Sequence, residues 1–214
     1  MTHHIANFRR EYASRYLLEN DVKSDPIQQF AEWWKDVLDA KVEEPNAMTF
    51  ATASLDGMPS ARLLLLKGFD EAGFVFFTNY ESYKGMHLAE NPKACMVFYW
   101  KELERQIRIT GLVNKISGEA SDEYFASRPQ GSKISALSSP QSKVVKSREW
   151  LDDQFNELVK QNTGTEIQRP NFWGGYVLKP VIVEFWQGRT SRLHDRIQYS
   201  LQDDGVWKIE RLAP

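Results

Sequence analysis

Five apolar residues recur three or four positions apart near the start of the chain: Ile27, Phe30, Trp34, Val37 and Leu38. This is the spacing of one face of an α-helix. Asp25-Pro26 precedes them, an acid suited to the N-cap and a proline suited to the first helical position. We therefore expect a helix that begins after Asp25 and ends before Pro45. Residues 1–24 are polar and weakly patterned, and we expect a mobile arm there.

From Met48 onward the apolar period shortens, and β-branched and aromatic residues indicate strands. Asp56-Gly57 predicts the turn of one hairpin, and Asp203-Asp204-Gly205 predicts another. The expected strands cover residues 49–55, 61–67, 74–79, 94–100, 105–116, 175–178, 181–186, 192–199 and 206–211. Helices are expected near residues 82–90, 119–127 and 147–161, with a connection rich in Ser, Gly and Pro between the last two.

Short strands with few helices between them indicate an antiparallel barrel with flanking helices, a mainly β (α+β) fold, rather than a parallel βαβ sheet. The chain of 214 residues is long enough for a sizeable core. No long polar linker interrupts the pattern, so we expect residues 25–214 to form a single domain.

The composition is that of a globular protein, with 42% hydrophobic and 26% charged residues. The formal net charge of −2 argues against a general nucleic-acid binder, so any anion site must be local. Cys95 is the only cysteine, which excludes an intrachain disulfide and favours a reducing cytoplasm. We expect its thiol to be buried and structural. No apolar run is long enough to predict a membrane span.

Several common catalytic motifs are missing. The sequence has no glycine-rich dinucleotide motif, P-loop, G-x-S-x-G or metal-type spacing of Cys and His, so we expect no metal. The most telling segment is Arg192-Leu-His194-Asp-Arg196. If it is extended, its alternate side chains share one face, where two guanidiniums and an imidazole would bind an anion. A solvated edge strand is the alternative.

Two further segments place cations at the ends of strands. Arg62-Leu63-Leu64-Leu65-Leu66-Lys67 is an apolar strand with a cation at each end, and its leucines predict burial on both faces. Both cations could instead extend to solvent. Thr78 to Lys84 leads from a strand into a helix, with Ser82 as a cap. Free backbone N–H groups and a lysine at a helix start suit a phosphate, although a capped surface helix fits equally well.

A third segment ends a helix with three hydrogen-bond donors, Tyr124, Arg128 and Ser132, which would suit a second phosphate. The alternative is that Arg128 complements the helix dipole. The amide of Gln106 could both donate to and accept from a heteroaromatic ring, or lie exposed. Two separable phosphate sites with aromatic walls and no metal suit a flat phosphorylated cofactor with a small phosphorylated substrate.

Motifs spread from Arg9 to Pro214 resemble the pyridoxine (pyridoxamine) 5′-phosphate oxidase family. They are Arg62-Leu-Leu-Leu-Leu-Lys67, Phe77-Thr-Asn79, Glu104-Arg-Gln106, Tyr124-Phe-Ala-Ser-Arg-Pro129, Phe172-Trp-Gly-Gly-Tyr176, Glu184-Phe-Trp-Gln-Gly188, Arg192-Leu-His-Asp-Arg196 and Trp207-Lys-Ile-Glu-Arg-Leu-Ala-Pro214. The resemblance implies a homodimer of FMN-binding split β-barrels of antiparallel Greek-key type, with FMN at the interface. It also implies a cytoplasmic pyridoxal 5′-phosphate synthase of vitamin B6 metabolism. Such an enzyme oxidises pyridoxine or pyridoxamine 5′-phosphate with dioxygen and forms hydrogen peroxide.

The resemblance also implies roles for single residues. Arg62 and Lys84 would hold the FMN phosphate, and Arg192 and His194 would be catalytic and cover the substrate's pyridine ring. The other FMN-binding residues would be Leu63, Leu64, Leu65, Leu66, Lys67, Phe77, Thr78, Gln106, Gln141, Ser142, Trp186 and Arg196, of which Arg196 would face the N1/O2 edge of the flavin. The substrate would contact Lys67, Tyr124, Arg128 and Ser132 through its phosphate, with Arg9, Arg10 and Tyr12 as a lid.

One position departs from the family pattern. The family commonly has arginine just before the phosphate-binding lysine, whereas this chain has Tyr83, which donates one hydrogen bond and adds no charge. Two other functions stay open on the sequence alone. One is a split-barrel reductase with a nicotinamide donor, and the other is a non-catalytic protein that binds FMN or pyridoxal phosphate.

Overall fold

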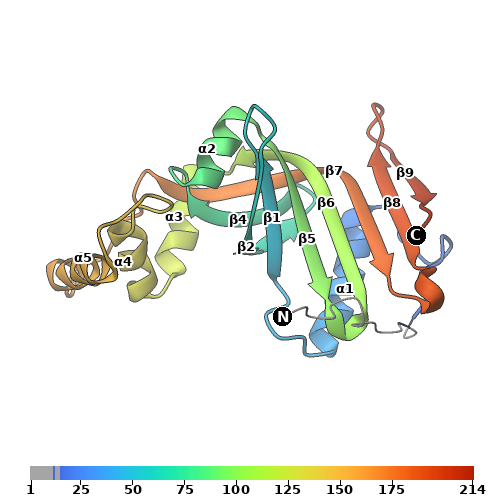
Figure 1. The fold of residues 1–214 in the computed structure, drawn as a ribbon, viewed down its shortest axis with the longest axis horizontal. Coiled ribbons are helices and arrows are strands. Elements are labelled where there is room, and N and C mark those ends of the chain that lie inside the picture. Colours follow the sequence, from blue (N-terminus) through green and yellow to red (C-terminus); the bar gives the residue numbers. More distant parts are fainter. Residues whose placement is uncertain (1–11, 13–14) are drawn as a thin grey trace, which may run out of the picture. The chain divides into compact units, whose positions relative to one another are not determined.

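The computed structural model describes residues 12 and 15–214 (Figure 1). Arg9 and Arg10, expected in the lid, lie outside the described residues. The described chain groups into two compact units. The first comprises the residues up to Phe50 with Cys95–Gly111 and Pro180–Pro214, and the second comprises Ala51–Ala94 and Leu112–Lys179. The prediction of a single domain at 25–214 after an arm at 1–24 stays a prediction.

Within the described residues the sheet has nine strands: β1 Ala47–Ala53, β2 Pro59–Leu65, β3 Gly68–Asp70, β4 Gly73–Asn79, β5 Lys93–Trp100, β6 Arg105–Lys115, β7 Trp173–Gln187, β8 Asp195–Leu201 and β9 Trp207–Arg211. Their order is β2-β1-β5-β6-β7-β4-β3, and β8 pairs with β7 and β9. The pairs β3–β4, β4–β7, β7–β8 and β8–β9 are antiparallel. This confirms the mainly β antiparallel class that the short strands predicted.

The described chain also forms five α-helices: α1 Pro26–Asp39, α2 Tyr83–Glu90, α3 Gly118–Ser127, α4 Gln130–Ser138 and α5 Arg148–Gln161. Two short 3-10 turns, Lys101–Leu103 and Thr190–Arg192, complete the elements. None of the described helices has the length and apolar character needed to cross a membrane. Nor do the described residues contain a group of His, Cys, Asp or Glu side chains suited to a metal ion.

The first unit is built around α1. Asp25 caps this helix as predicted, since its carboxylate accepts hydrogen bonds from the backbone N–H groups of Ile27 and Gln28. The apolar face of the helix buries Phe30, whose ring lies 5.4 Å from that of Phe98 on β5. Trp33 packs edge-on against Phe185 on β7 with ring centroids 5.1 Å apart. Aromatic packing therefore attaches the helix to the sheet strands of the same unit.

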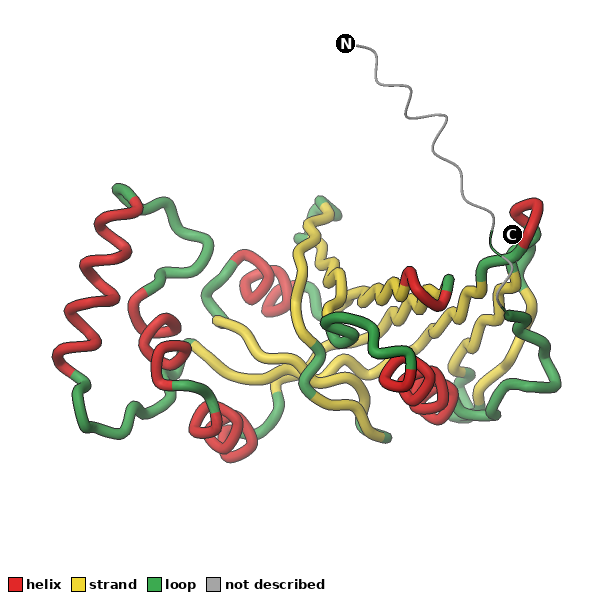
Figure 2. Tube along the Cα trace, turned by 90° about the horizontal axis from the view of Figure 1, so that it is seen from below, coloured by secondary structure: helices red, strands yellow, loops and turns green. Residues whose placement is uncertain are grey.

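The second unit has its own apolar cluster. It is formed by Phe125 on α3, Ile134 on α4, Trp173 on β7 and Ile167, which precedes β7. Helices α3, α4 and α5 lie close together in both Figure 1 and Figure 2, where helices are red and strands yellow. Phe155 and Leu158 of α5 are half-buried against this cluster. The cluster supports the short helices that carry Tyr124, Arg128 and Ser132.

Two predictions about the bounds of helices and strands were wrong. The connection expected between 127 and 147 contains helix α4. The two strands expected around Pro180 are one strand, β7, because Trp173–Leu178 pairs with β4 and the segment 182–187 pairs with β8. Pro180 therefore falls between the two paired stretches, where this sheet tolerates a residue without an N–H.

The leucine strand was also expected to be buried on both faces, but β2 is an edge strand with alternating exposure. Leu63 is 74% exposed and Leu65 is 39% exposed, whereas Leu66 is buried. The alternation follows because successive side chains of a strand point to opposite faces of the sheet, and one face of β2 is more exposed than the other. Cys95 is half-buried rather than fully buried.

Candidate functional site

Lys84 lies in the first turn of α2, and its side chain is buried. Its ammonium donates hydrogen bonds to Thr78 Oγ1 at 3.0 Å, Ser82 Oγ at 2.9 Å and Gln141 Oε1 at 3.1 Å. All three of these acceptors are neutral oxygens. Burial, together with the nearby Arg62, lowers the pKa of Lys84 to about 8. A buried cation that lacks a carboxylate partner is a natural site for an anion.

The backbone at the start of α2 is held tightly enough to fix this lysine. Ser82 is the N-cap, and its hydroxyl accepts from the N–H of Gly85 as the sequence predicted. A Cβ at Gly85 would lie 2.0 Å from the carbonyl oxygen of Tyr80, so only glycine fits there. Tyr83 is 59% exposed and does not line the cavity described next. Tyr83 is neutral and therefore adds no positive charge next to Lys84.

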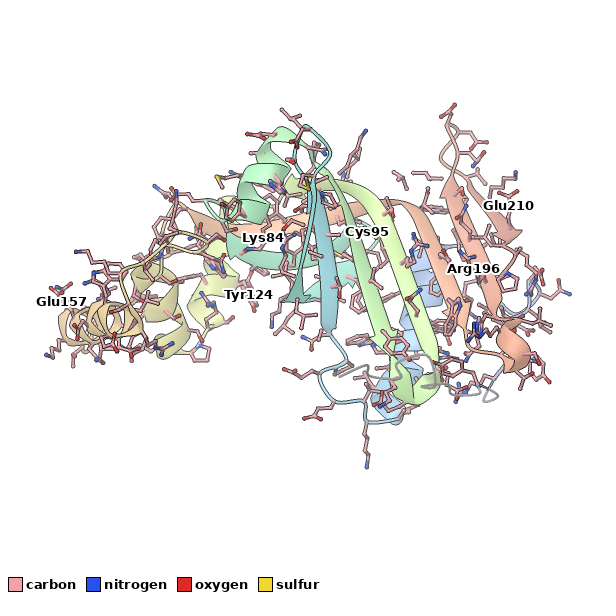
Figure 3. All side chains as sticks on the ribbon, in the orientation of Figure 1. Lys84, Cys95, Tyr124, Glu157, Arg196 and Glu210 are labelled. Atoms are coloured by element: carbon pink, nitrogen blue, oxygen red, sulfur yellow. The ribbon has the colours of Figure 1, made fainter. Side chains whose placement is uncertain are left out.

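A cavity of about 560 Å³ opens in the second unit. The sequence-predicted residues that line it are Leu63, Leu64, Leu65, Lys67, Phe77, Thr78, Tyr124, Arg128, Ser132 and Gln141. It gathers parts of both predicted phosphate-binding groups, since Thr78 and Gln141 contact Lys84 while Tyr124, Arg128 and Ser132 come from α3 and its junction with α4. Figure 3 labels Lys84 and Tyr124 on their elements.

One wall of the cavity is aromatic. Phe77 on β4 stacks on Tyr124 with ring centroids 3.8 Å apart and an interplanar angle of 16°. Trp173 lies parallel to Tyr124 at 6.2 Å and near-parallel to Phe77 at 5.6 Å. No role was predicted for Trp173, although the Phe172–Tyr176 motif that contains it resembles the family. Parallel rings suit the flat face of a heteroaromatic ligand.

Arg128 supplies the clearest sign of a ligand in this cavity. Its guanidinium lies 4.5 Å from the centre of the Trp173 ring and 5.4 Å from that of Phe125. Its Nη1 atom is buried and has no hydrogen-bond partner among the described residues. Burial also lowers the pKa of Arg128 below its usual value. Because a buried donor without an acceptor is costly, an anion in the cavity would complete its hydrogen bonding.

Arg62 lies at the middle of β2 and is half-buried. Its Nη1 donates to Thr52 Oγ1 at 2.9 Å, and its Nη2 donates to Ser60 Oγ at 2.7 Å. Burial lowers the pKa of this guanidinium as well. After burial, the positive charge of Arg62 is the second cause of the lowered pKa of Lys84. Two like charges held near each other favour a multiply charged anion.

His194 is the centre of a second cluster, in the first unit. Its ring lies 4.6 Å from that of Trp186 and 6.0 Å from that of Tyr12. The backbone N–H of Arg189 donates to His194 Nδ1 at 3.1 Å. Nδ1 is therefore an acceptor, and the proton of the neutral ring is on Nε2. Burial and the nearby Arg192 lower the pKa of His194, which keeps the imidazole neutral.

The alignment expected for Arg192, His194 and Arg196 on one strand face was wrong. Strand β8 begins only at Asp195, because Gln187 pairs with Asp195 and the residues between them must reverse the chain. Ser191 and Arg192 take left-handed conformations with φ of 55° and 61°. Arg192 is exposed on this turn, while Arg196 lies on the strand. The three side chains belong to one connection but not to one strand face.

Arg196 is held by a carboxylate. Its Nε donates to Glu184 Oε1 at 2.8 Å, and its Nη1 donates to the carbonyl oxygen of Ala213 at 2.7 Å. Glu184 is buried and also accepts from Arg108 at 3.0 Å. The hydrogen bond to Glu184 raises the pKa of Arg196. Two guanidiniums against one carboxylate leave this group with a single net positive charge. Figure 3 labels Arg196 on β8.

The other predicted residues are placed as follows. Leu66 is buried next to the cavity-lining leucines, and Ser142 is exposed with a φ of 72°. Gln106 is half-buried on β6, and neither it nor Trp186 lines the cavity of the second unit. Tyr12 is described and packs edge-on against Trp186 at 5.8 Å.

The fold and the cavity together indicate the structural class of this protein. An antiparallel sheet with flanking helices and an anion-suited cavity is the architecture of the FMN-binding split-barrel proteins. A crystal structure described as a pyridoxamine 5′-phosphate oxidase-related, FMN-binding protein from Nostoc punctiforme matches the fold with a TM-score of 0.72 at 18% identity. It covers 94% of this chain and 100% of that one. The fold of this chain is therefore the split-barrel fold of that class.

The family follows from the sequence comparisons. A family model described as pyridoxamine 5′-phosphate oxidase matches residues 34–162, and a model for the pyridoxine 5′-phosphate oxidase C-terminal dimerisation region matches residues 173–214. The chain is 54% identical to the pyridoxine/pyridoxamine 5′-phosphate oxidase of Salinibacter ruber over 98% of this chain and 99% of that one. It is 50% identical over 100% of both chains to the same enzyme from a Cyanothece strain. The chain belongs to the pyridoxine/pyridoxamine 5′-phosphate oxidase family.

One similar solved structure contains a carboxylic acid as its ligand. PhzG from Burkholderia lata, crystallised with tetrahydrophenazine-1-carboxylic acid, is 32% identical to this chain with a TM-score of 0.88. The alignment covers 94% of this chain and all of PhzG. The substrate of this chain therefore depends on the residues that line its own cavity.

Proposed function

We propose that this chain catalyses the FMN-dependent oxidation of pyridoxine 5′-phosphate and pyridoxamine 5′-phosphate to pyridoxal 5′-phosphate. Dioxygen is the electron acceptor and hydrogen peroxide the by-product, and the amine substrate also releases ammonia. The observation that carries the proposal is the buried, unpaired Nη1 of Arg128 in a cavity whose other side is formed by the partners of Lys84. Two cationic groups beside one cavity suit two phosphorylated ligands.

The FMN phosphate binds Arg62 and Lys84. The three hydrogen-bond acceptors of the Lys84 ammonium are neutral oxygens, and Arg62 donates to the neutral hydroxyls of Thr52 and Ser60. The phosphate replaces the missing carboxylate at the buried ammonium and relieves the repulsion between the two cations. When bound, FMN supplies the hydride acceptor of the reaction, and the protein supplies position and electrostatics. The remaining proposed FMN contacts are Leu63, Leu64, Leu65, Leu66, Lys67, Phe77, Thr78, Gln106, Gln141, Ser142, Trp186 and Arg196.

The substrate phosphate binds the donors at the other side of the cavity, Lys67, Tyr124, Arg128 and Ser132. Each of these side chains lines the cavity, and the four together offer more donors than one carboxylate needs. A phosphate with three terminal oxygens accepts from all of them. This donor set favours a phosphorylated substrate over a carboxylate such as the PhzG ligand. Binding energy from the phosphate then orients the reacting carbon.

His194 and Arg192 contact the pyridine ring of the substrate. Because Arg189 donates to Nδ1, the neutral imidazole of His194 presents its Nε2–H as a donor to the ring substituents. Trp186 and Tyr12 enclose this imidazole on two sides. Tyr12, with Arg9 and Arg10, closes over the substrate and excludes water. His194 therefore positions the substrate by hydrogen bonding while it is neutral.

The active form is a homodimer with FMN at its interface, in a cytoplasmic location. The match of residues 173–214 to the dimerisation region of the family supports the dimer. The exposed leucines of the edge strand β2, Leu63 and Leu65, supply apolar surface suited to contact with a second copy and also line the FMN cavity. The free thiol of Cys95 is in keeping with a reducing compartment.

The test is aerobic incubation of the FMN-supplemented protein with pyridoxine 5′-phosphate. Pyridoxal 5′-phosphate is followed by its absorbance and hydrogen peroxide by a coupled peroxidase. We expect equimolar aldehyde and peroxide, and far slower turnover of unphosphorylated pyridoxine. Protein that carries FMN but forms no aldehyde would overturn the proposal. Oxidation of a reduced nicotinamide in the same assay would then indicate the reductase, and inertness toward both donors would indicate a non-catalytic binder.

A further inference from the structure

A chain of hydrogen bonds links three elements of the second unit beneath the proposed FMN phosphate site. Arg62 on β2 donates through Nη1 to Thr52 Oγ1 on β1 at 2.9 Å. The same Thr52 oxygen lies 3.1 Å from Nδ1 of His87, which is on α2. Thr52 is only 3% exposed, so water does not compete freely for its hydroxyl. None of the roles considered so far explains Thr52 or His87.

The direction of each hydrogen bond follows from the chemistry of the groups. A guanidinium has only donors, so Thr52 Oγ1 must accept from Arg62. The threonine hydroxyl keeps one proton to donate, and Nδ1 of His87 lies within reach of it. In the tautomer of His87 that accepts this proton, the ring proton is on Nε2. The two hydrogen bonds orient each other, because the hydroxyl cannot rotate without losing one of them.

Thr52 supplies Arg62 with a neutral acceptor. Ser60 Oγ, at 2.7 Å from Nη2 of Arg62, is a second neutral acceptor. A carboxylate in either place would hold the guanidinium equally well but would cancel its charge toward an incoming phosphate. Neutral acceptors keep the plane of the guanidinium fixed and leave its charge available.

The same chain of hydrogen bonds connects the two cations of the phosphate site. Lys84 and His87 are three residues apart on α2, one turn of helix. Thr52 reaches from β1 to both the strand that carries Arg62 and the helix that carries Lys84. Because Lys84 and His87 share α2, a displacement of the helix that moved Lys84 relative to Arg62 would also strain the His87 contact to Thr52. The network therefore keeps the spacing of the two cations constant.

We propose that Thr52 and His87 are positioning residues that hold the Arg62 guanidinium, at a fixed distance from Lys84, for the 5′-phosphate of FMN. This inference rests on the proposed function, since it assumes that Arg62 and Lys84 bind that phosphate. Neither Thr52 nor His87 touches the ligand. Their effect is on the phosphate alone and not on the flavin ring.

The test compares FMN with riboflavin, which lacks the phosphate. Dissociation constants of both are measured by quenching of flavin fluorescence on the wild-type protein and on Thr52→Val, Thr52→Ser and Thr49→Val. Thr52→Val keeps the shape of the side chain and removes the acceptor. We expect it to weaken FMN binding about tenfold and to leave riboflavin binding unchanged. Thr52→Ser should restore FMN affinity, and Thr49→Val, elsewhere on β1, should bind both flavins like the wild type.

A second pair of variants tests His87. His87→Asn places an amide oxygen where Nδ1 accepts, so we expect near wild-type preference for FMN over riboflavin. His87→Leu fills the space without an acceptor and should reduce that preference severalfold. Circular dichroism and thermal unfolding of each variant show whether the fold is retained. Because riboflavin binding is read on the same protein, a variant that is merely misfolded loses both flavins together.

The outcomes separate this inference from the function on which it rests. If the wild-type protein binds riboflavin as tightly as FMN, the phosphate site at Arg62 and Lys84 is wrong, and the proposed function fails with it. If the wild type prefers FMN but Thr52→Val keeps the full preference, the positioning role alone is overturned. An equal loss of both flavins in Thr52→Val, with Thr52→Ser not restoring either, would assign Thr52 to packing and would also overturn it.

Discussion

The backbone N–H of Arg189 donates a hydrogen bond to Nδ1 of His194 over 3.1 Å. This contact joins the two ends of the turn between β7 and β8 and sets the tautomer of the imidazole. It also gives His194 a reason to stay neutral, because a second proton on Nδ1 would face the Arg189 N–H donor. Arg192 adds a positive charge that acts in the same direction on the pKa of His194.

A pH profile follows from that contact. Burial and the nearby Arg192 lower the pKa of His194 below its usual 6.5, so the neutral ring predominates at pH 7 and above. We expect kcat/KM for pyridoxine 5′-phosphate to lose its His194-dependent part as pH falls through the lowered pKa, on the acid side of 6.5. The measurement is kcat/KM from pH 5 to 8 on the wild type and on His194→Gln, whose amide donates but does not titrate. An identical acidic limb in both proteins would show that another group titrates.

Replacement of Arg192 tests the division of roles between the two units. Arg192 is exposed on the turn and is not among the residues that line the cavity. Arg192→Ala should therefore reduce kcat/KM by about a hundredfold through lost substrate orientation while FMN stays bound. Flavin content is measured by absorbance after gel filtration. Arg189→Ala serves as the control on the same turn, since its backbone N–H to His194 survives. Loss of FMN from Arg192→Ala would mean that this residue belongs to the cofactor site.

The unpaired donor of Arg128 predicts a substrate-binding defect. Arg128→Met keeps much of the packing on Trp173 but removes the charge. We expect KM for the phosphorylated substrate to rise by a factor that corresponds to a loss of about 1.5–3 kcal/mol in binding free energy, as for Lys67→Ala. Steady-state kinetics with pyridoxine 5′-phosphate provide the measurement. Arg148→Met, on the exposed start of α5, is the matched control. An unchanged KM in Arg128→Met would remove it from the substrate site.

Lys84 predicts an opposition between stability and binding. In the folded protein its pKa is about 8, against 10.5 as the ordinary value, so the unfolded chain binds the proton more tightly. The destabilisation is complete below pH 8 and is relieved as pH rises toward 10. Lys84→Met should raise the free energy of unfolding of the FMN-free protein by about 1–3 kcal/mol at pH 7, and it should abolish FMN binding.

Urea unfolding at pH 7 and at pH 9.5 provides the measurement for Lys84. The gain from Lys84→Met should shrink at the higher pH, because the wild-type lysine is then largely neutral. Lys93→Met, at the exposed start of β5, should show no such dependence. FMN affinity of the wild type should fall between pH 8 and pH 9.5, since phosphate binding requires the ammonium. A variant that is less stable at both pH values would contradict this account of Lys84.

Gly188 predicts an effect on the N-terminal segment. A Cβ at this position would lie 2.7 Å from Cγ of Tyr12 and 3.1 Å from Cβ of Glu104. Gly188→Ala should therefore displace Tyr12 from His194 and raise KM for the substrate severalfold, with little change in FMN affinity. Gly68→Ala is the control, since a Cβ there meets no atom within 4 Å. Wild-type kinetics in Gly188→Ala would show that the Tyr12 contact does not serve catalysis.

Local signals in the sequence predicted the elements that have local causes. The Asp25 cap and the Ser82 cap were found because each acts on residues two or three positions away. The strand face expected for Arg192 to Arg196 failed because the register of Gln187 with Asp195 sets where β8 begins. That register depends on strand pairing, which a single stretch of sequence does not reveal. The exposure of Leu63 likewise depends on the position of β2 at the sheet edge.

For the site, resemblance located many of the residues that line the cavity, but contacts between distant segments were missed. Thr52 and His87 are 35 positions apart and carry no motif, so only the fold brings them together. Trp173 was present in a recognised motif, yet its stacking on Phe77 and its contact with Arg128 needed the structure. The resemblance identified side chains proposed to contact a ligand. It did not identify the side chains that position them, such as Thr52 and His87.

The exposed leucines of β2 also bear on how the protein is made. A newly folded single copy presents Leu63 and Leu65 on a strand that ends the sheet, where backbone groups are open to further pairing. An exposed edge strand is a template for pairing with strands of other chains, including non-native ones. The yield of native protein at synthesis therefore depends on how fast this edge meets another copy of the chain relative to how fast it misassembles.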